Sequence, residues 1–172
     1  MAPSTAGNRG QTELSPSSTR LLGLGNEILA DDAFGIVAAR QIEALGLPGL
    51  EVVTSSESGI SLLDHLQGAG RLIVTDTIQT GRAEPGTVHV VREQDVAGAP
   101  GGSPHFIGLF DTLALGRALG LRMPADVVII AVEAADCLTL GGPMHPVVAA
   151  ALPRVVELVR QANMGGEVLR AV

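Results

Sequence analysis

Short, continuous apolar runs alternate along the sequence with segments of helical periodicity. The runs occupy residues 20–24, 50–53, 72–74, 87–91 and 127–132, and helical spacing of apolar residues falls at about 31–45, 59–66, 109–119 and 146–161. Strands that are apolar on both faces are typical of parallel sheets covered by helices. The pattern predicts an α/β protein: a single three-layer sandwich with a mainly parallel twisted sheet of about five strands and helices on both faces.

One strand is expected to run against the others. The run at 87–91 follows the preceding strand after only about nine residues, which include Gly81, Pro85 and Gly86. A parallel crossover needs about a dozen residues or more. The sequence therefore predicts that this strand is antiparallel to its predecessor.

The length of 172 residues indicates one domain, at about 150 residues per domain. Residues 1–19 are polar and rich in Ser, Thr, Pro and Gly, so we expect a disordered tail, then one domain over 20–163 and a C-terminal tail over 164–172. Cys137 is the single cysteine, and no apolar run approaches the roughly 18 residues of a membrane span. These features predict a cytoplasmic location without export or membrane insertion.

Composition also excludes several kinds of chemistry. All eleven basic residues are arginine, so a Schiff-base or phosphate-loop lysine is absent. The formal charge of -7 and the presence of only three aromatic residues argue against nucleic acid as a partner. Gly23 and Gly25 form a lone G-x-G, and Ile28 stands where the third glycine of a dinucleotide fingerprint belongs. No bound organic cofactor is predicted.

Polar residues converge at one edge of the predicted sheet. Asp31 and Asp32 follow the first strand, and Asp76 lies just beyond the third. His105 precedes a helix that leads into the final parallel strand, so it returns to the carboxyl edge, where sites form in such folds. We therefore expect Asp32, Asp76 and His105 to face one another.

Two chemistries suit these three residues. Two carboxylates and an imidazole supply oxygen and nitrogen ligands for a metal, with room for further ligands. The two carboxylates could instead share a proton and act as an acid/base pair. Each residue also has a simpler explanation: a helix cap for Asp31 or Asp32, a turn residue for Asp76, and a surface loop histidine for His105.

The other three histidines are interpreted as structural. His65 is predicted near a helix C-terminus, where positive charge is favourable. His89 alternates with valines in a possible edge strand and is expected to point to solvent, whereas His145 adjoins Pro146 at a helix entry.

The sequence resembles the hydrogenase maturation proteases, the endopeptidases that trim the large subunit of nickel-iron hydrogenases. GLGNEILADDAFG at 23–35 is similar to the family's opening G-x-G-N-x-x-x-x-D-[DE]-x-x-G. In the same order, SGISLL at 58–63, RLIVTDT at 71–77, EPGTV at 84–88 and SPHFIGL at 103–109 resemble later family segments. The resemblance covers residues 20 to about 161.

The resemblance implies a nickel-dependent hydrolase that removes a C-terminal extension from the large-subunit precursor of a nickel-iron hydrogenase. It assigns Asp32, Asp76 and His105 to both the catalytic and the nickel-binding set. The nickel would be carried by the precursor, which is the implied partner. How the peptide bond is attacked is left open between a polarised carbonyl and a water activated by metal or carboxylate.

The chain departs from the family pattern in two loops. Residues 54–58 read TSSES where the family usually has a loop of Asp-Gly/Cys-Gly-Thr character that is thought to help select the substrate. EAAD at 133–136 departs from the commoner pattern with Pro-Glu. Two other functions remain open: a stand-alone zinc or manganese metallohydrolase at the same ligands, and a non-catalytic chaperone that binds the hydrogenase subunit.

Overall fold

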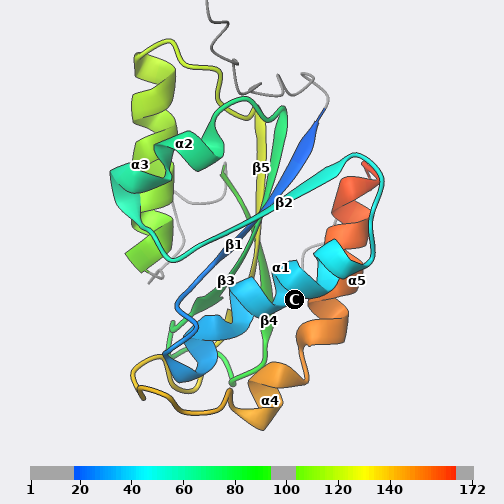
Figure 1. Cartoon of the computed structure of the whole chain (residues 1–172). Coiled ribbons are helices and arrows are strands. Elements are labelled where there is room, and N and C mark those ends of the chain that lie inside the picture. Colours follow the sequence, from blue (N-terminus) through cyan, green and yellow to red (C-terminus); the bar gives the residue numbers. More distant parts are fainter. Residues whose placement is uncertain (1–17, 94–103, 166–172) are drawn as a thin grey trace, which may run out of the picture.

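The computed structural model describes residues 18–93 and 104–165. Within these residues five strands form one sheet in the order β2-β1-β3-β5-β4 (Figure 1). The strands are β1 (Thr19–Leu24), β2 (Leu50–Ser55), β3 (Arg71–Ile78), β4 (Val88–Arg92) and β5 (Asp126–Glu133).

The strand directions confirm the predicted mixed sheet. The pairs β1–β2, β1–β3 and β3–β5 are parallel, and β4 runs antiparallel to β5. β4 does not pair with its predecessor β3, however, because β5 lies between them. The short connection from β3 passes the end of β5 before β4 begins. Two hydrogen bonds hold it there: the Gly86 N–H donates to Glu133 O and the Glu133 N–H donates to Thr87 O, each at 2.8 Å.

Helices cover both faces of the sheet, as predicted. α1 (Phe34–Ala44), α4 (Pro146–Ala149) and α5 (Leu152–Asn163) belong to one face, and α2 (Leu63–Leu66) and α3 (Pro104–Ala118) to the other (Figure 1). α5 buries a helical stripe of Val155, Leu158, Val159 and Ala162. The two faces have separate apolar cores because successive side chains of each strand point to opposite sides.

The predicted helices differ from the observed ones at their starts. Short 3₁₀ turns, η1 (Ala30–Ala33) and η2 (Gly59–Leu62), precede α1 and α2. The single helix predicted over 146–161 is two helices, α4 and α5, and Pro153 lies at the start of α5. Proline is tolerated there because the first N–H groups of a helix have no intrahelical partner, which removes the difficulty that Pro153 posed.

The boundaries of two further predicted segments change. β3 continues to Ile78, so Asp76 lies inside the strand and not beyond it; Asp76 pairs in register with Ala131 of β5. Of the predicted N-terminal tail, residues 1–17 lie outside the described part, and Thr19 already belongs to β1. Residues 166–172 of the predicted C-terminal tail also lie outside it. Within the described residues no helix is long and apolar enough to cross a membrane.

Candidate active site at the carboxyl edge of the sheet

Asp32 and Asp76 are joined through one residue, Thr77. The Thr77 hydroxyl donates to Asp32 Oδ1 at 3.1 Å, and the Thr77 N–H donates to Asp76 Oδ1 at 2.7 Å. Asp32 lies in η1, partly exposed, whereas Asp76 is fully buried on β3. The structure thus brings together the two predicted carboxylates, one from η1 and one from β3, at the same edge of the sheet.

His105 is the second residue of α3, the helix that covers the face of the sheet on which Asp76 lies. Asp76 shares that face with Leu72 and Val74, which belong to the core beneath α3. The His105 side chain lies outside the described residues. Its predicted contact with the two aspartates therefore stays a prediction.

Two glycines of the opening motif allow the backbone to approach these carboxylates. A Cβ on Gly25, whose φ is +142°, would lie 1.9 Å from the Asp32 carbonyl oxygen. A Cβ on Gly35 would lie 2.1 Å from Leu24 O, 2.3 Å from Thr75 O and 2.9 Å from the Asp76 Cα. The motif spacing therefore has a physical basis, since glycine at these positions lets η1 and α1 pack directly against β1 and β3.

Asp31 has a different role from Asp32. Its buried carboxylate accepts N–H groups from Ala135 and Asp136, both at 2.8 Å, and from His145 at 2.6 Å. Neither aspartate makes a helix-capping side-chain bond, so the simple capping explanation is wrong. Asp31 instead fastens the loop after β5 to η1, and this explains why two aspartates stand side by side.

Two groups of that loop have shifted pKa values. Burial, above all, raises the pKa of the Cys137 thiol to about 11, and the carboxylates of Asp32, Asp31 and Asp76 add to the shift. Cys137 donates weakly to the Thr77 hydroxyl at 3.8 Å, so a protonated thiol borders the site. A hydrogen bond from the Thr139 side chain, followed by the N–H groups of Leu138 and Thr139, lowers the pKa of Asp136.

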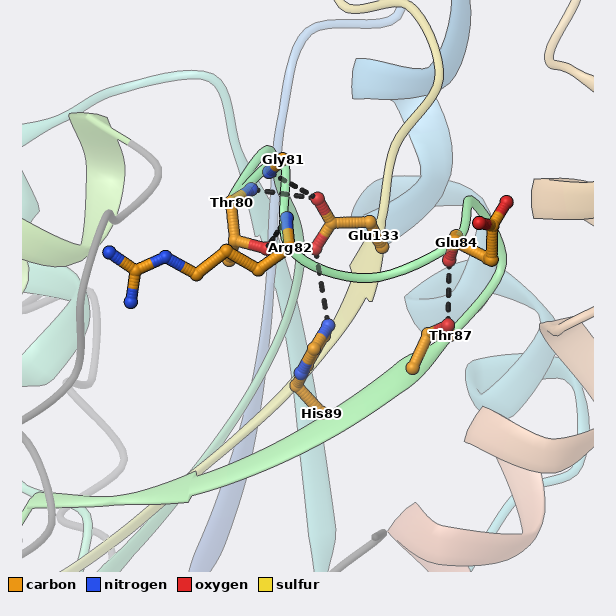
Figure 2. Close-up of polar contacts among 7 residues, drawn as sticks. All are labelled: Thr80, Gly81, Arg82, Glu84, Thr87, His89 and Glu133. Carbon is orange, nitrogen blue, oxygen red and sulfur yellow. Dashed lines mark hydrogen bonds and ion pairs between the residues drawn. The ribbon is translucent and has the colours of Figure 1, made fainter.

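His89 is not directed to solvent as predicted. Its Nε2 lies 3.2 Å from Oε2 of Glu133, and the His89 side chain is 28% exposed. Glu133 is buried and also accepts hydrogen bonds from the β3–β4 loop, residues 79–87 (Figure 2). The prediction failed because an edge strand was assumed to face water, whereas the end of β5 supplies an acid beside it.

Sequence reasoning also missed Thr77 and Glu133. Each left a signal: Thr77 is one of three consecutive polar residues that follow the apolar run at 72–74, and Glu133 directly follows the apolar run at 127–132. Among the side chains that the structure describes, no group of three or more His, Cys, Asp or Glu could hold a metal ion, and His105 lies outside that search.

The fold and the site define an α/β protein with paired carboxylates at the carboxyl edge of its sheet. The family model of the hydrogenase maturation proteases, HycI, matches residues 39–162. The chain belongs to this family.

Individual relatives agree with this assignment. The hydrogenase expression/formation protein HupD of Bradyrhizobium diazoefficiens is 32% identical over 82% of this chain and 75% of its own length. HupM of Azotobacter chroococcum, also named a hydrogenase expression/formation protein, is 35% identical over 77% of this chain, which spans 65% of that relative. The structure of HybD, a hydrogenase maturating endopeptidase from Escherichia coli, matches with a TM-score of 0.71 and 27% identity over 86% of this chain and 94% of HybD.

Proposed function

We propose that this protein is a nickel-dependent endopeptidase that removes the C-terminal extension of a nickel-iron hydrogenase large-subunit precursor. Family membership supports a protease. The observation that carries the proposal is the Asp32–Thr77–Asp76 connection, because it holds a carboxylate of η1 and a carboxylate of β3 together at one edge of the sheet.

The nickel is part of the proposed substrate. Asp32 and Asp76 offer oxygen donors and His105 a nitrogen donor, and such a set suits a divalent first-row metal whose other ligands come from the precursor. Nickel would then act as a recognition signal, since a precursor without it lacks one side of the contact. In the aspartyl-protease-like form of the reaction, one carboxylate accepts a hydrogen bond from the attacking water and so activates it.

The proposal is tested by incubating the protein with nickel-loaded and nickel-free precursor and following cleavage by mass spectrometry. We expect cleavage of the loaded form only, and loss of cleavage in Asp32→Asn. The matched control is Asp64→Asn, an exposed aspartate on α2. Equal cleavage of both precursors, or of neither, would contradict the proposal.

A metal measurement separates this function from that of a stand-alone metallohydrolase. The isolated protein is treated with a mild chelator, and its zinc, manganese and nickel contents are then determined. If the nickel is carried by the precursor, the isolated protein should retain little metal after this treatment. Retained zinc or manganese, together with cleavage of nickel-free precursor, would favour a metallohydrolase with its own bound metal. A protein that binds the precursor without cutting it would favour the chaperone function.

A further inference from the structure

Glu133 is a buried acid that the proposed function does not use. Its Oε1 accepts the N–H groups of Thr80 at 2.8 Å and Gly81 at 3.0 Å. Its Oε2 accepts the Thr80 hydroxyl at 2.9 Å and lies 3.2 Å from His89 Nε2 (Figure 2). Since a buried carboxylate is costly unless it is hydrogen-bonded, these contacts hold Glu133 in one orientation.

His89 and Glu133 lie on the same face of the sheet as Asp76. Asp76 pairs in register with Ala131 of β5, and Ala131 pairs with His89 of β4, so the three form one row across the sheet. Neighbouring strands are about 4.8 Å apart, which places the Cα atoms of Asp76 and His89 about 10 Å from each other. Ala131 between them contributes only a methyl group, so the two polar side chains flank it.

The Glu133 carboxylate determines which nitrogen of His89 carries the proton. An ionised carboxylate only accepts hydrogen bonds, so the nitrogen next to it, Nε2, must be the donor. The lone pair of the neutral ring then lies on Nδ1. A carboxylate that holds one nitrogen of a histidine protonated and orients the ring is the arrangement by which proteins prepare imidazoles for proton transfer.

A second Glu–His pair in the molecule has the same contact distance but a different environment. His65 Nε2 also lies 3.2 Å from a glutamate, Glu57, but that glutamate is 51% exposed whereas Glu133 is 3% exposed. Exposed ion pairs contribute little to stability because solvent screens them. The His89 pair differs because its acid is buried and because it shares a row with Asp76.

We propose that His89, oriented by Glu133, is a second proton-transfer residue of the active site. The inference rests on the proposed peptide cleavage. Water adds through oxygen to the scissile carbonyl carbon while one of its protons passes to Nδ1 of His89. The carbon–nitrogen bond then breaks as that proton passes to the departing nitrogen, so one water is consumed and the ring returns to its first state. Glu133 is a positioning residue that fixes the orientation of the ring.

The test compares His89→Gln and Glu133→Gln with wild type on nickel-loaded precursor, with His65→Gln as the matched control. Loss of a general acid–base group should lower kcat of His89→Gln about 10²-fold while KM stays near the wild-type value. In Glu133→Gln the amide NH₂ faces His89, so Nε2 must accept and the proton moves to Nδ1. We expect kcat to fall about 10-fold or more, as for other residues that orient a functional histidine.

Nitrogen-15 NMR of the His89 ring provides a readout that a merely structural role would not move. Wild type should show the Nε2–H tautomer when neutral, and Glu133→Gln the Nδ1–H tautomer. An Nδ1–H tautomer in wild type, or His89→Gln that cleaves like wild type, overturns the inference. Because His89→Gln removes a partly exposed side chain, it decides the question even if Glu133→Gln fails to fold.

Failure of the proposed function is distinguishable. A wild-type protein that cleaves no precursor overturns the proposed function and this inference together. If wild type cleaves the precursor, Asp76→Asn does not, and His89→Gln is fully active, then only this inference is overturned.

Discussion

Asp31 and Asp32 are neighbours in the sequence, but they belong to two different regions of the molecule. Asp31 is buried and accepts three backbone N–H groups, so it forms an anchor, which we call the Asp31 anchor, between η1 and residues 135–145. Asp32 is partly exposed and shares Thr77 with Asp76 in what we call the carboxylate edge. A carboxylate whose oxygens are taken up by backbone N–H groups thus supports structure, while one that remains accessible can bind a ligand.

The largest expected effect concerns the carboxylate edge. Asp76→Asn should reduce precursor cleavage about 10³-fold, because the uncharged amide binds a metal ion weakly and does not accept a proton. The measurement is the single-turnover rate, with circular dichroism to verify the fold. If Asp76→Asn were as active as wild type, the carboxylate edge would not have the catalytic role that distinguishes it from the Asp31 anchor.

The next effect concerns the Asp31 anchor. Asp31→Ala leaves three N–H groups without their carboxylate, and we expect the free energy of unfolding to fall by about 3 kcal/mol. Urea denaturation measures it. Asp31→Asn should lose less, since its amide oxygen still accepts. An Asp31→Ala protein as stable as wild type would show that the anchor contributes nothing.

Cys137 reports on burial at the boundary between the two regions. With its pKa raised from 9.0 to about 11, the thiol stays protonated at pH 8, and its thiolate fraction is about 100-fold smaller than that of an ordinary cysteine. We expect alkylation by iodoacetamide to be slower in the native protein by about this factor. Equal rates in native and urea-unfolded protein would contradict the burial of Cys137 that the structure shows.

The smallest effect concerns Asp136, on the loop that Asp31 anchors. Its pKa is lowered from 3.8, so its charged form favours the folded loop at neutral pH, and this contribution is lost as the pH falls through the lowered pKa. The amide proton shifts of Leu138 and Thr139, followed by NMR on acidification, should titrate with a midpoint below 3.8. A midpoint at or above 3.8 would contradict the hydrogen bonds described for Asp136.

Much of the fold was predictable because it depends on local pattern. Continuous apolar runs indicated strands buried on both faces, and the short connection through Gly81 and Gly86 indicated that β4 is antiparallel. The position of β4 beside β5 was not predictable, because it depends on the hydrogen bonds of Gly86 and Thr87 with Glu133, 46 residues or more away in sequence. The helix break before Pro153 was signalled by the proline itself.

The site was predictable only in part. Topology alone placed Asp32 and Asp76 at one edge, since parallel strands end together. The roles of Asp31, Thr77 and Glu133 depend on contacts with residues distant in the chain, and no spacing rule connects Asp31 with His145 or Glu133 with His89.

By itself, the sequence determined the α/β class, the glycine positions that permit close packing near Asp32 and Asp76, and the family to which the chain belongs. These depend on residue type and on spacing along the chain, which are local properties. The tertiary structure decided which of two adjacent aspartates is an anchor, and that His89 pairs with a buried acid. Hydrogen bonding and burial are set by groups that folding brings together, so identical side chains acquire different roles.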